Sequence, residues 1–242
     1  KMAPALAAGN CIVMKPAEIT PLSSLRIAEL MAEAGLPPGV VNMLPGLGSV
    51  AGQYIAEHPE IAKIAFTGST ATGRRIVQAS AGNLKKVQLE LGGKGPNIVF
   101  EDANLQAAVN GSAWAIFHNQ GQACIAGSRL MLHEKIADAF LEQFIPLARS
   151  IRLGNPLDEN TEMGPLTSAQ HRERVLSYVE VAQGEGGELL AGGKSPGGDL
   201  AKGCYVEPTV MRARSYKDRV AQEEVFGPFV TVLTFKNDEE AM

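Results

Sequence analysis

The sequence has 242 residues, with 22 Lys and Arg against 26 Asp and Glu, which leaves a net charge of −4 at pH 7. This balance lacks the basic character of nucleic-acid-binding proteins, and no apolar run approaches the ~18 residues of a membrane-spanning helix. We therefore expect neither nucleic acid nor a membrane as a partner. Three widely separated cysteines are typical of a reducing compartment and predict a cytoplasmic location.

Strand-like and helix-like segments alternate along the N-terminal part of the chain. Strands are predicted at residues 11–14, 40–44, 61–66 and 85–91, and helices from Pro21, at 49–57 and at 69–80. Pro21 occupies the start position that proline favours in helices, and apolar residues recur along the turns that follow. Strands separated by helices predict β-α-β units on a parallel sheet.

The same alternation restarts after Gly92 and Gly93. Strands are predicted at 96–100, 129–133, 189–190, 205–211 and 229–235, and helices at 104–118, 135–150 and 168–183. We therefore expect an α/β protein of two domains, residues 1–92 and 93–242. The glycine-rich stretch 184–203 lacks the strand–loop–helix setting of a phosphate-binding loop and predicts surface turns.

Two segments of the N-terminal part suit a nucleotide. Gly68, Ser69 and Gly73 lie where a predicted strand leads into the start of a predicted helix, and main-chain N–H groups at a helix start bind anions such as a pyrophosphate. Lys15 and Glu18 follow the first predicted strand, at the strand end where open α/β sheets bind ligands. A carboxylate there accepts hydrogen bonds from ribose hydroxyls and repels a 2′-phosphate, which favours NAD over NADP. The alternatives are a plain capped helix and a solvated Lys/Glu pair.

Further chemistry-bearing residues stand near glycines. Glu90 precedes Gly92 at a strand end, where a carboxylate is a candidate general base, or simply an exposed edge residue. Cys124 ends the polar run N-Q-G-Q-A-C, and its thiolate is a candidate nucleophile toward a carbonyl carbon. The alternative, a small buried apolar cysteine, is what we expect of Cys11 and Cys204.

Two smaller features complete the pattern. Glu224 and Phe226 belong to the run E-E-V-F-G-P, which also fits a solvated loop. The four histidines form no cluster with cysteine or with one another, so no metal site is expected.

In combination, these segments resemble the NAD(P)-dependent aldehyde dehydrogenase superfamily in order, context and spacing. The motifs E-L-G-G-K, from Glu90, and G-Q-x-C, ending at Cys124, carry the resemblance most specifically. It implies part of a Rossmann-like NAD-binding domain over residues 1–92 and part of a catalytic domain over 93–242. Cys124 is then the nucleophile that forms a thiohemiacetal with an aldehyde and afterwards a thioester. Glu90 activates the water that releases a carboxylic acid.

The resemblance also implies NAD as the cofactor and assigns its contacts. Lys15 and Glu18 would contact the adenosine ribose. Gly68, Ser69 and Gly73 would meet the pyrophosphate. The nicotinamide end would lie against Gly92, Glu224 and Phe226. The main-chain N–H of Cys124 would supply half of an oxyanion hole.

The family's second oxyanion donor, an asparagine in a P-W-N-F-P-type segment, has no match in this sequence. We therefore expect the chain to be the central piece of a longer enzyme, whose parent is a homodimer or homotetramer. Gly95 and Ala123 stand where the family often has serine and a second cysteine. Three alternatives stay open: a non-catalytic nucleotide-binding piece, a CoA-acylating relative, and a thiol hydrolase that pairs a histidine with Cys124.

Overall fold

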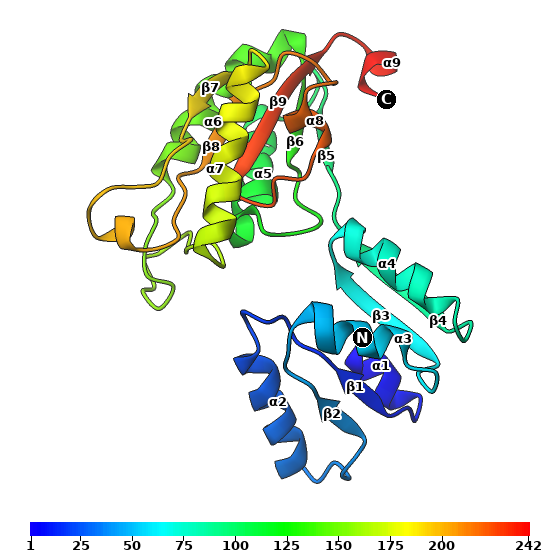
Figure 1. Cartoon of the computed structure of the whole chain (residues 1–242). Helices are drawn as coiled ribbons and strands as arrows, with labels where there is room; N and C mark the ends of the chain where they lie inside the picture. Colours follow the sequence, from blue (N-terminus) through cyan, green and yellow to red (C-terminus); the bar gives the residue numbers. More distant parts are fainter. The chain divides into compact units, whose positions relative to one another are not determined.

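A computed structural model describes residues 1–242, which divide into two compact units, Lys1–Leu91 and Gly92–Met242. The division falls one residue before the boundary that the sequence predicts. Both units contain helices and parallel strands, so the predicted α/β class is confirmed (Figure 1). None of the helices combines the length and the apolar character needed to cross a bilayer.

The Lys1–Leu91 unit holds two separate pairs of parallel strands, β1–β2 and β3–β4. Its elements are α1 (Met2–Ala7), β1 (Ile12–Met14), α2 (Leu22–Glu33), β2 (Val41–Met43), α3 (Gln53–Glu57), β3 (Lys63–Gly68), α4 (Thr70–Ser80) and β4 (Lys86–Leu91). The predicted helix 49–57 is divided into a π-helical turn, Gly48–Gly52, and α3. Helix α1 has no counterpart among the predicted elements.

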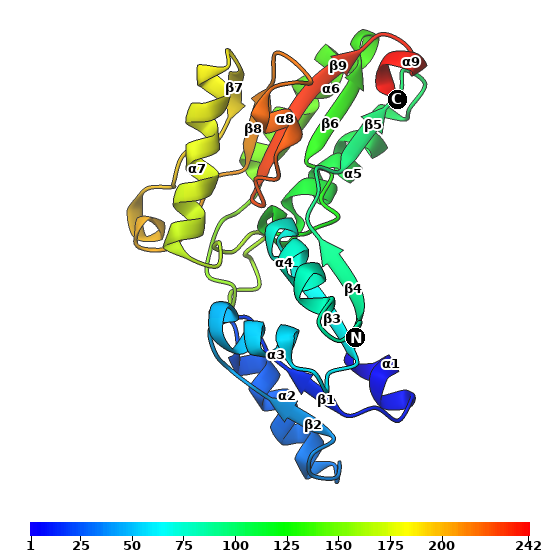
Figure 2. The same ribbon diagram turned by 45° about the vertical axis from the view of Figure 1, so that its right-hand side comes forward.

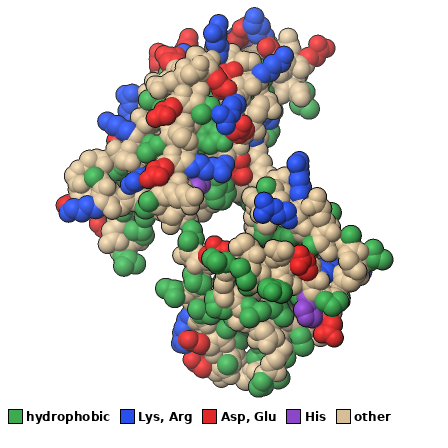
Figure 3. All heavy atoms as spheres, viewed as in Figure 1, with side chains coloured by type: hydrophobic (Ala, Val, Ile, Leu, Met, Phe, Trp, Pro, Cys, Tyr) green, Lys and Arg blue, Asp and Glu red, His purple; other side chains and the backbone are tan.

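Few apolar side chains of this unit are buried. Its core consists of Ala56, Ile64 and Ile76, with partly buried neighbours from β3 and β4. Leu22 of α2 is 78% exposed. Figure 3 shows the apolar side chains of this unit as a green cluster on its surface. Cys11 is exposed, contrary to expectation, because it precedes the short strand β1 and no layer covers it.

The Gly92–Met242 unit is built on one five-stranded sheet in the order β5-β6-β9-β8-β7, in which only β7 is antiparallel. Figure 2 shows these strands side by side, from β7 at the left to β5 at the right. Its elements are β5 (Pro96–Val99), α5 (Leu105–Phe117), β6 (Arg129–His133), α6 (Glu134–Ser150), α7 (Ala169–Gly184), β7 (Glu188–Ala191), β8 (Thr209–Arg212), α8 (Arg219–Gln222), β9 (Phe229–Phe235) and α9 (Asp238–Ala241).

Successive side chains of each strand point to opposite faces of the sheet and therefore pack into two separate cores. Val230 and Val232 of β9 pack with α5 and α6, whereas Phe229 and Leu233 pack with α7 and α8. The sheet is therefore covered on both faces, which explains why its strands read as continuous apolar runs. Cys204 packs, partly buried, against the second core, in line with its expected apolar role.

Local signals in the sequence account for most element boundaries. Asn104 and Ser168 cap α5 and α7, because their side-chain oxygens accept hydrogen bonds from main-chain N–H groups three residues on. The predicted strand 205–211 begins only at Thr209, since Pro208 before it has no N–H to pair. The stretch 184–203 holds β7 and the 3₁₀ turn Gly198–Lys202 besides the expected turns.

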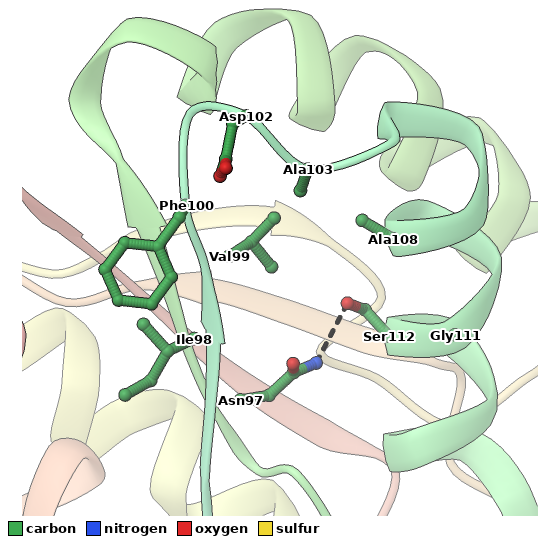
Figure 4. Close-up of a pocket in the computed structure, with 9 residues that line it drawn as sticks. All are labelled: Asn97, Ile98, Val99, Phe100, Asp102, Ala103, Ala108, Gly111 and Ser112. Carbon is green, nitrogen blue, oxygen red and sulfur yellow. Dashed lines mark hydrogen bonds between the residues drawn. The ribbon is translucent and has the colours of Figure 1, made fainter.

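A pocket of about 340 Å³ lies between the edge strand β5 and α5. Its lining includes Asn97, whose amide donates to Ser112 Oγ at 2.9 Å, and the side chain of Asp102 (Figure 4). None of the residues predicted for chemistry or cofactor binding lines this pocket.

The α5–α6 core depends on aromatic packing around Phe140, which is fully buried against Phe144 with ring centroids 5.5 Å apart. We expect Phe140→Ala to lower the free energy of unfolding by about 3–5 kcal/mol through the lost contacts and the cavity. Leu157→Ala, at a side chain 91% exposed, should change it by less than about 0.5 kcal/mol. Urea titration monitored by circular dichroism measures both, and equal losses would contradict the packing described.

Candidate active site

Cys124 lies exposed in a loop whose backbone is unusually constrained. After α5, residues Asn119, Gln120 and Gly121 take left-handed φ angles of 50°, 57° and 66°. For Gln120 this costs about 1–2 kcal/mol, whereas asparagine, the residue at position 119, adopts this conformation more readily. The Asn119 side chain donates to the carbonyl of Gln122 at 3.0 Å, and the N–H of Gln122 donates back to the Asn119 carbonyl at 3.0 Å. These bonds fix the turn that delivers Cys124.

The loop at residues 223–228 lies against this turn. A Cβ at position 121 would overlap the carbonyl oxygen of Gly227, so the two backbones meet where Gly121 has no side chain. Gly127, beyond Cys124, donates its N–H to the Ala115 carbonyl at 3.0 Å and so ties the other side of the loop to α5. The cysteine loop is thus held from both sides.

The two adjacent acids of the 223–228 loop play different parts. Glu223 accepts hydrogen bonds from Arg219 Nε at 2.9 Å and from the Tyr178 hydroxyl at 2.8 Å. The hydrogen bonds from Arg219 lower the pKa of the Glu223 carboxyl, whereas burial raises the pKa of Tyr178. Glu224 instead directs its carboxylate to the backbone, where it accepts from the N–H of Gly93 at 3.3 Å.

Gly92 is what allows Glu224 to lie there. A Cβ at position 92 would overlap the Glu224 carboxylate. Phe226, two residues on, has a left-handed φ of 61° and is 37% exposed. Gly92 therefore meets Glu224, which is far from it in the sequence, beside the cysteine loop, and Phe226 belongs to the same loop as Glu224.

A small cavity marks the meeting point. Its volume is about 10 Å³, close to the minimum that holds one water molecule. It is lined by Gly93, Gly121, Ala123, Ala126, Ser128, Glu224, Phe226 and Gly227. Three loops, before β5, after α5 and before β9, thus converge here with Cys124 next to one of the lining residues.

Lys94 is a feature of this region that the sequence analysis did not single out. Its Nζ is buried without a hydrogen-bond partner, as is Nε of Arg129. Burial, with a smaller contribution from the charge of Arg129, lowers the pKa of Lys94 to about 7, and Glu224 opposes the shift. In the sequence, only the position of Lys94 in the motif E-L-G-G-K singles this residue out, and the motif does not predict that its side chain is buried.

The residues of the Lys1–Leu91 unit that are predicted to bind the nucleotide form two groups. Lys15 donates to the carbonyls of Pro16 at 2.8 Å and Gly46 at 3.2 Å. Glu18 accepts from the N–H of Gly48. Lys15 and Glu18 therefore both contact the loop that follows β2, at the carboxyl ends of the parallel strands β1 and β2.

The second group surrounds the start of α4. Ser69 caps this helix by accepting from the N–H of Thr72 at 3.2 Å, and Gly68 ends β3 immediately before it. Gly73 is buried, and a Cβ there would lie 2.8 Å from Leu91 Cδ2, so this glycine brings α4 close to β4. Its role in the structure is helix–strand packing.

Glu90 belongs to β4, in register with Thr67 of β3. It is exposed, while its neighbours Leu89 and Leu91 are partly buried, because successive side chains of a strand point to opposite faces. The structure contains no group of three or more His, Cys, Asp or Glu side chains arranged to hold a metal ion.

Comparison with known proteins decides the family. The model of the aldehyde dehydrogenase family matches residues 1–242, which is the whole chain. The chain belongs to the aldehyde dehydrogenase family. It is 49% identical to the betaine aldehyde dehydrogenase of Bacillus subtilis over 100% of its own length and 50% of that protein's. The chain thus spans about half the length of the curated relatives it matches.

Solved structures agree with this family membership. PnpE from Pseudomonas sp. WBC-3 is 71% identical, with a TM-score of 0.97 over 100% of this chain and 50% of that one. PnpE has also been crystallised in complex with nicotinamide adenine dinucleotide. A betaine aldehyde dehydrogenase of Staphylococcus aureus in complex with NAD⁺ is 45% identical, with a TM-score of 0.97 over 100% and 48% of the two chains.

Glycines 92 and 121 should respond differently to substitution by alanine. The methyl group added by Gly92→Ala would contact only the carboxylate end of the Glu224 side chain, which can move. The substitution should therefore displace Glu224 and lower the free energy of unfolding by less than about 1 kcal/mol. The methyl group added by Gly121→Ala would overlap the main chain of Gly227, at a residue with a left-handed φ. This substitution should lower the free energy of unfolding by at least about 2 kcal/mol. Urea unfolding of both variants measures this; equal losses would contradict the geometry.

Lys94 should make stability depend on pH. Its folded-state pKa of about 7 lies below its ordinary 10.5, so the unfolded chain holds more protons between these values. The free energy of unfolding should therefore rise with pH in that window, by up to about 1.4 kcal/mol per pH unit, and stay level below it as far as Lys94 is concerned. Lys94→Met should flatten the slope; an unchanged slope, measured by urea titration at each pH, would disprove this.

Proposed function

We propose that this chain carries the nucleophile and the cofactor-binding elements of an NAD-dependent aldehyde dehydrogenase, which oxidises an aldehyde to a carboxylic acid. The observation that carries the proposal is the convergence of the Cys124 loop, the Gly92–Gly93 backbone and Glu224 around one small cavity. Relatives with matching folds were crystallised with NAD⁺, which supports the choice of cofactor. The units Lys1–Leu91 and Gly92–Met242 then belong to the NAD-binding and the catalytic domain.

Cys124 begins the reaction in this proposal. Its thiolate attacks the carbonyl carbon and forms a C–S bond, while the Cys124 N–H donates to the resulting oxyanion. NAD, when bound, supplies a nicotinamide ring that accepts a hydride from the same carbon. Cys124 then holds the acyl group as a thioester. Glu90 takes a proton from a water molecule that attacks this thioester, the C–S bond breaks, and the thiolate and the carboxylic acid are released.

The residues present fit NAD at both ends of the molecule. Glu224, held against a glycine backbone, is free to accept from the hydroxyls of the nicotinamide ribose, with Phe226 beside it. The Ser69-capped start of α4 offers main-chain N–H groups to the pyrophosphate. Lys15 and Glu18 would meet the adenosine ribose, where the carboxylate disfavours the 2′-phosphate of NADP.

The parent enzyme is proposed as a cytoplasmic homodimer or homotetramer acting on a small aldehyde. A CoA-acylating relative is the second candidate, and Glu90 favours water over CoA as the acyl acceptor. The third candidate is a piece that binds the nucleotide without catalysis, since the family's asparagine donor has no match within the chain.

The test is steady-state and burst kinetics of the full-length protein with NAD and an aldehyde. Cys124→Ser should lower kcat/KM at least about 10³-fold, whereas Cys11→Ser, at another exposed cysteine, should leave it unchanged. Glu90→Gln should keep a stoichiometric burst of NADH but lower kcat by about 10²–10⁴-fold, because only the acyl-transfer step needs the base.

Other outcomes would redirect the assignment. Turnover that needs CoA, and is insensitive to Glu90→Gln, would favour the CoA-acylating relative. Full activity of the Cys124→Ser variant would disprove the proposed nucleophile.

A further inference from the structure

One face of helix α7 contacts the Glu223–Gly227 loop over two successive turns, from His171 to Tyr178. His171, Arg174 and Tyr178 each reach a different residue of the loop, and Val175 between them is fully buried. Positions three, four and seven apart share one face of a helix, so these contacts form one continuous interface.

Two of the contacts hold main-chain carbonyls. His171 Nε2 lies 2.6 Å from the carbonyl oxygen of Phe226, and Arg174 Nη2 donates to the carbonyl of Glu224 at 3.0 Å. A carbonyl oxygen only accepts, so Nε2 of His171 carries the proton. The imidazole also meets the Phe226 ring edge to face, with centroids 5.9 Å apart.

The loop needs such anchors because its backbone is strained. Phe226 has a φ of 61°, a left-handed conformation that a residue with a bulky side chain rarely adopts unless its surroundings impose it. Val175 fixes the neighbouring residue, because a Cβ on Gly227 would lie 2.6 Å from Val175 Cγ2. The conformation that turns Glu224 toward Gly93 is thus held by side chains of α7.

We infer that α7 acts as a clamp on the Glu223–Gly227 loop, and that His171 and Arg174 are positioning residues for Glu224 and Phe226. The inference rests on the proposed function for its consequence, which is that the clamp prepares the loop to receive the nicotinamide half of NAD. His171 and Arg174 act here through the loop's carbonyl groups, and the clamp is formed before any ligand binds.

The experiment compares four variants of the full-length protein. His171→Ala removes the donor, and His171→Gln keeps an N–H that can reach the same carbonyl. Arg174→Met keeps the apolar stem but loses the donor. The matched control is Arg172→Ala on the same helix, because Arg172 donates to the carbonyl of Gly203 at 2.9 Å and does not contact the loop.

Two readouts separate the clamp from its consequence. Amide hydrogen exchange of residues 223–227 without cofactor should be at least about tenfold faster in His171→Ala and Arg174→Met, the factor expected from one lost hydrogen bond. Exchange in His171→Gln and Arg172→Ala should match the wild type. The Kd for NADH, measured by the fluorescence of NADH, should rise about tenfold in His171→Ala and Arg174→Met and stay unchanged in His171→Gln and Arg172→Ala.

Each result decides something. Unchanged exchange in His171→Ala and Arg174→Met would overturn the clamp. Faster exchange with an unchanged Kd for NADH would overturn its link to the cofactor. A wild-type protein that binds no NADH would contradict the proposed function, while the exchange rates would still decide on the clamp.

Discussion

The candidate active site depends on one close approach of two backbones, at Gly121 and Gly227. The carbonyl of Gly227 occupies the space that a side chain at position 121 would fill. On one side of this contact, a run of left-handed residues leads to Cys124. On the other side, the 223–228 loop carries Glu224 and Phe226. The nucleophile and the proposed cofactor contacts therefore hold their places only while this glycine pair stays in contact.

The charged groups of this region differ in their exposure to solvent, from the Arg219–Glu223 pair, whose side chains are 54% and 41% exposed, to the buried ammonium group of Lys94. Glu223 is neutralised by Arg219 and hydrogen-bonded by Tyr178, which leaves Glu224 as the acid directed to the Gly92–Gly93 backbone. Lys94 and Arg129 bring buried nitrogen atoms without partners to the same neighbourhood. Burial of an ammonium group favours its neutral form, so Lys94 stands near half-protonation at neutral pH. Glu224 thus accepts a hydrogen bond from the Gly93 backbone, and its negative charge opposes the lowering of the pKa of Lys94.

The Lys1–Leu91 unit is organised by hydrogen bonds to its loops more than by a core. Only Ala56, Ile64 and Ile76 form its buried apolar cluster. Lys15 and Glu18 nevertheless have defined places, because carbonyl and N–H groups of the loop after β2 hold them. The proposed adenosine-binding residues are thus positioned locally, whereas the residues around Cys124 require packing between distant parts of the chain.

The α/β class, most element boundaries and the family follow from the amino-acid sequence alone. Capping by Asn104 and Ser168 is local, and the motifs around Glu90 and Cys124 are contiguous, so one-dimensional patterns suffice for them. The packing of the folded chain was needed to show that Glu223 pairs with Arg219 and Tyr178, that Lys94 is buried, and that α7 holds the Glu223–Gly227 loop. Each of these depends on side chains that meet across large sequence separations. The exposure of Cys11 was decided in the same way, because burial depends on which layers cover a strand, and an apolar run does not specify them.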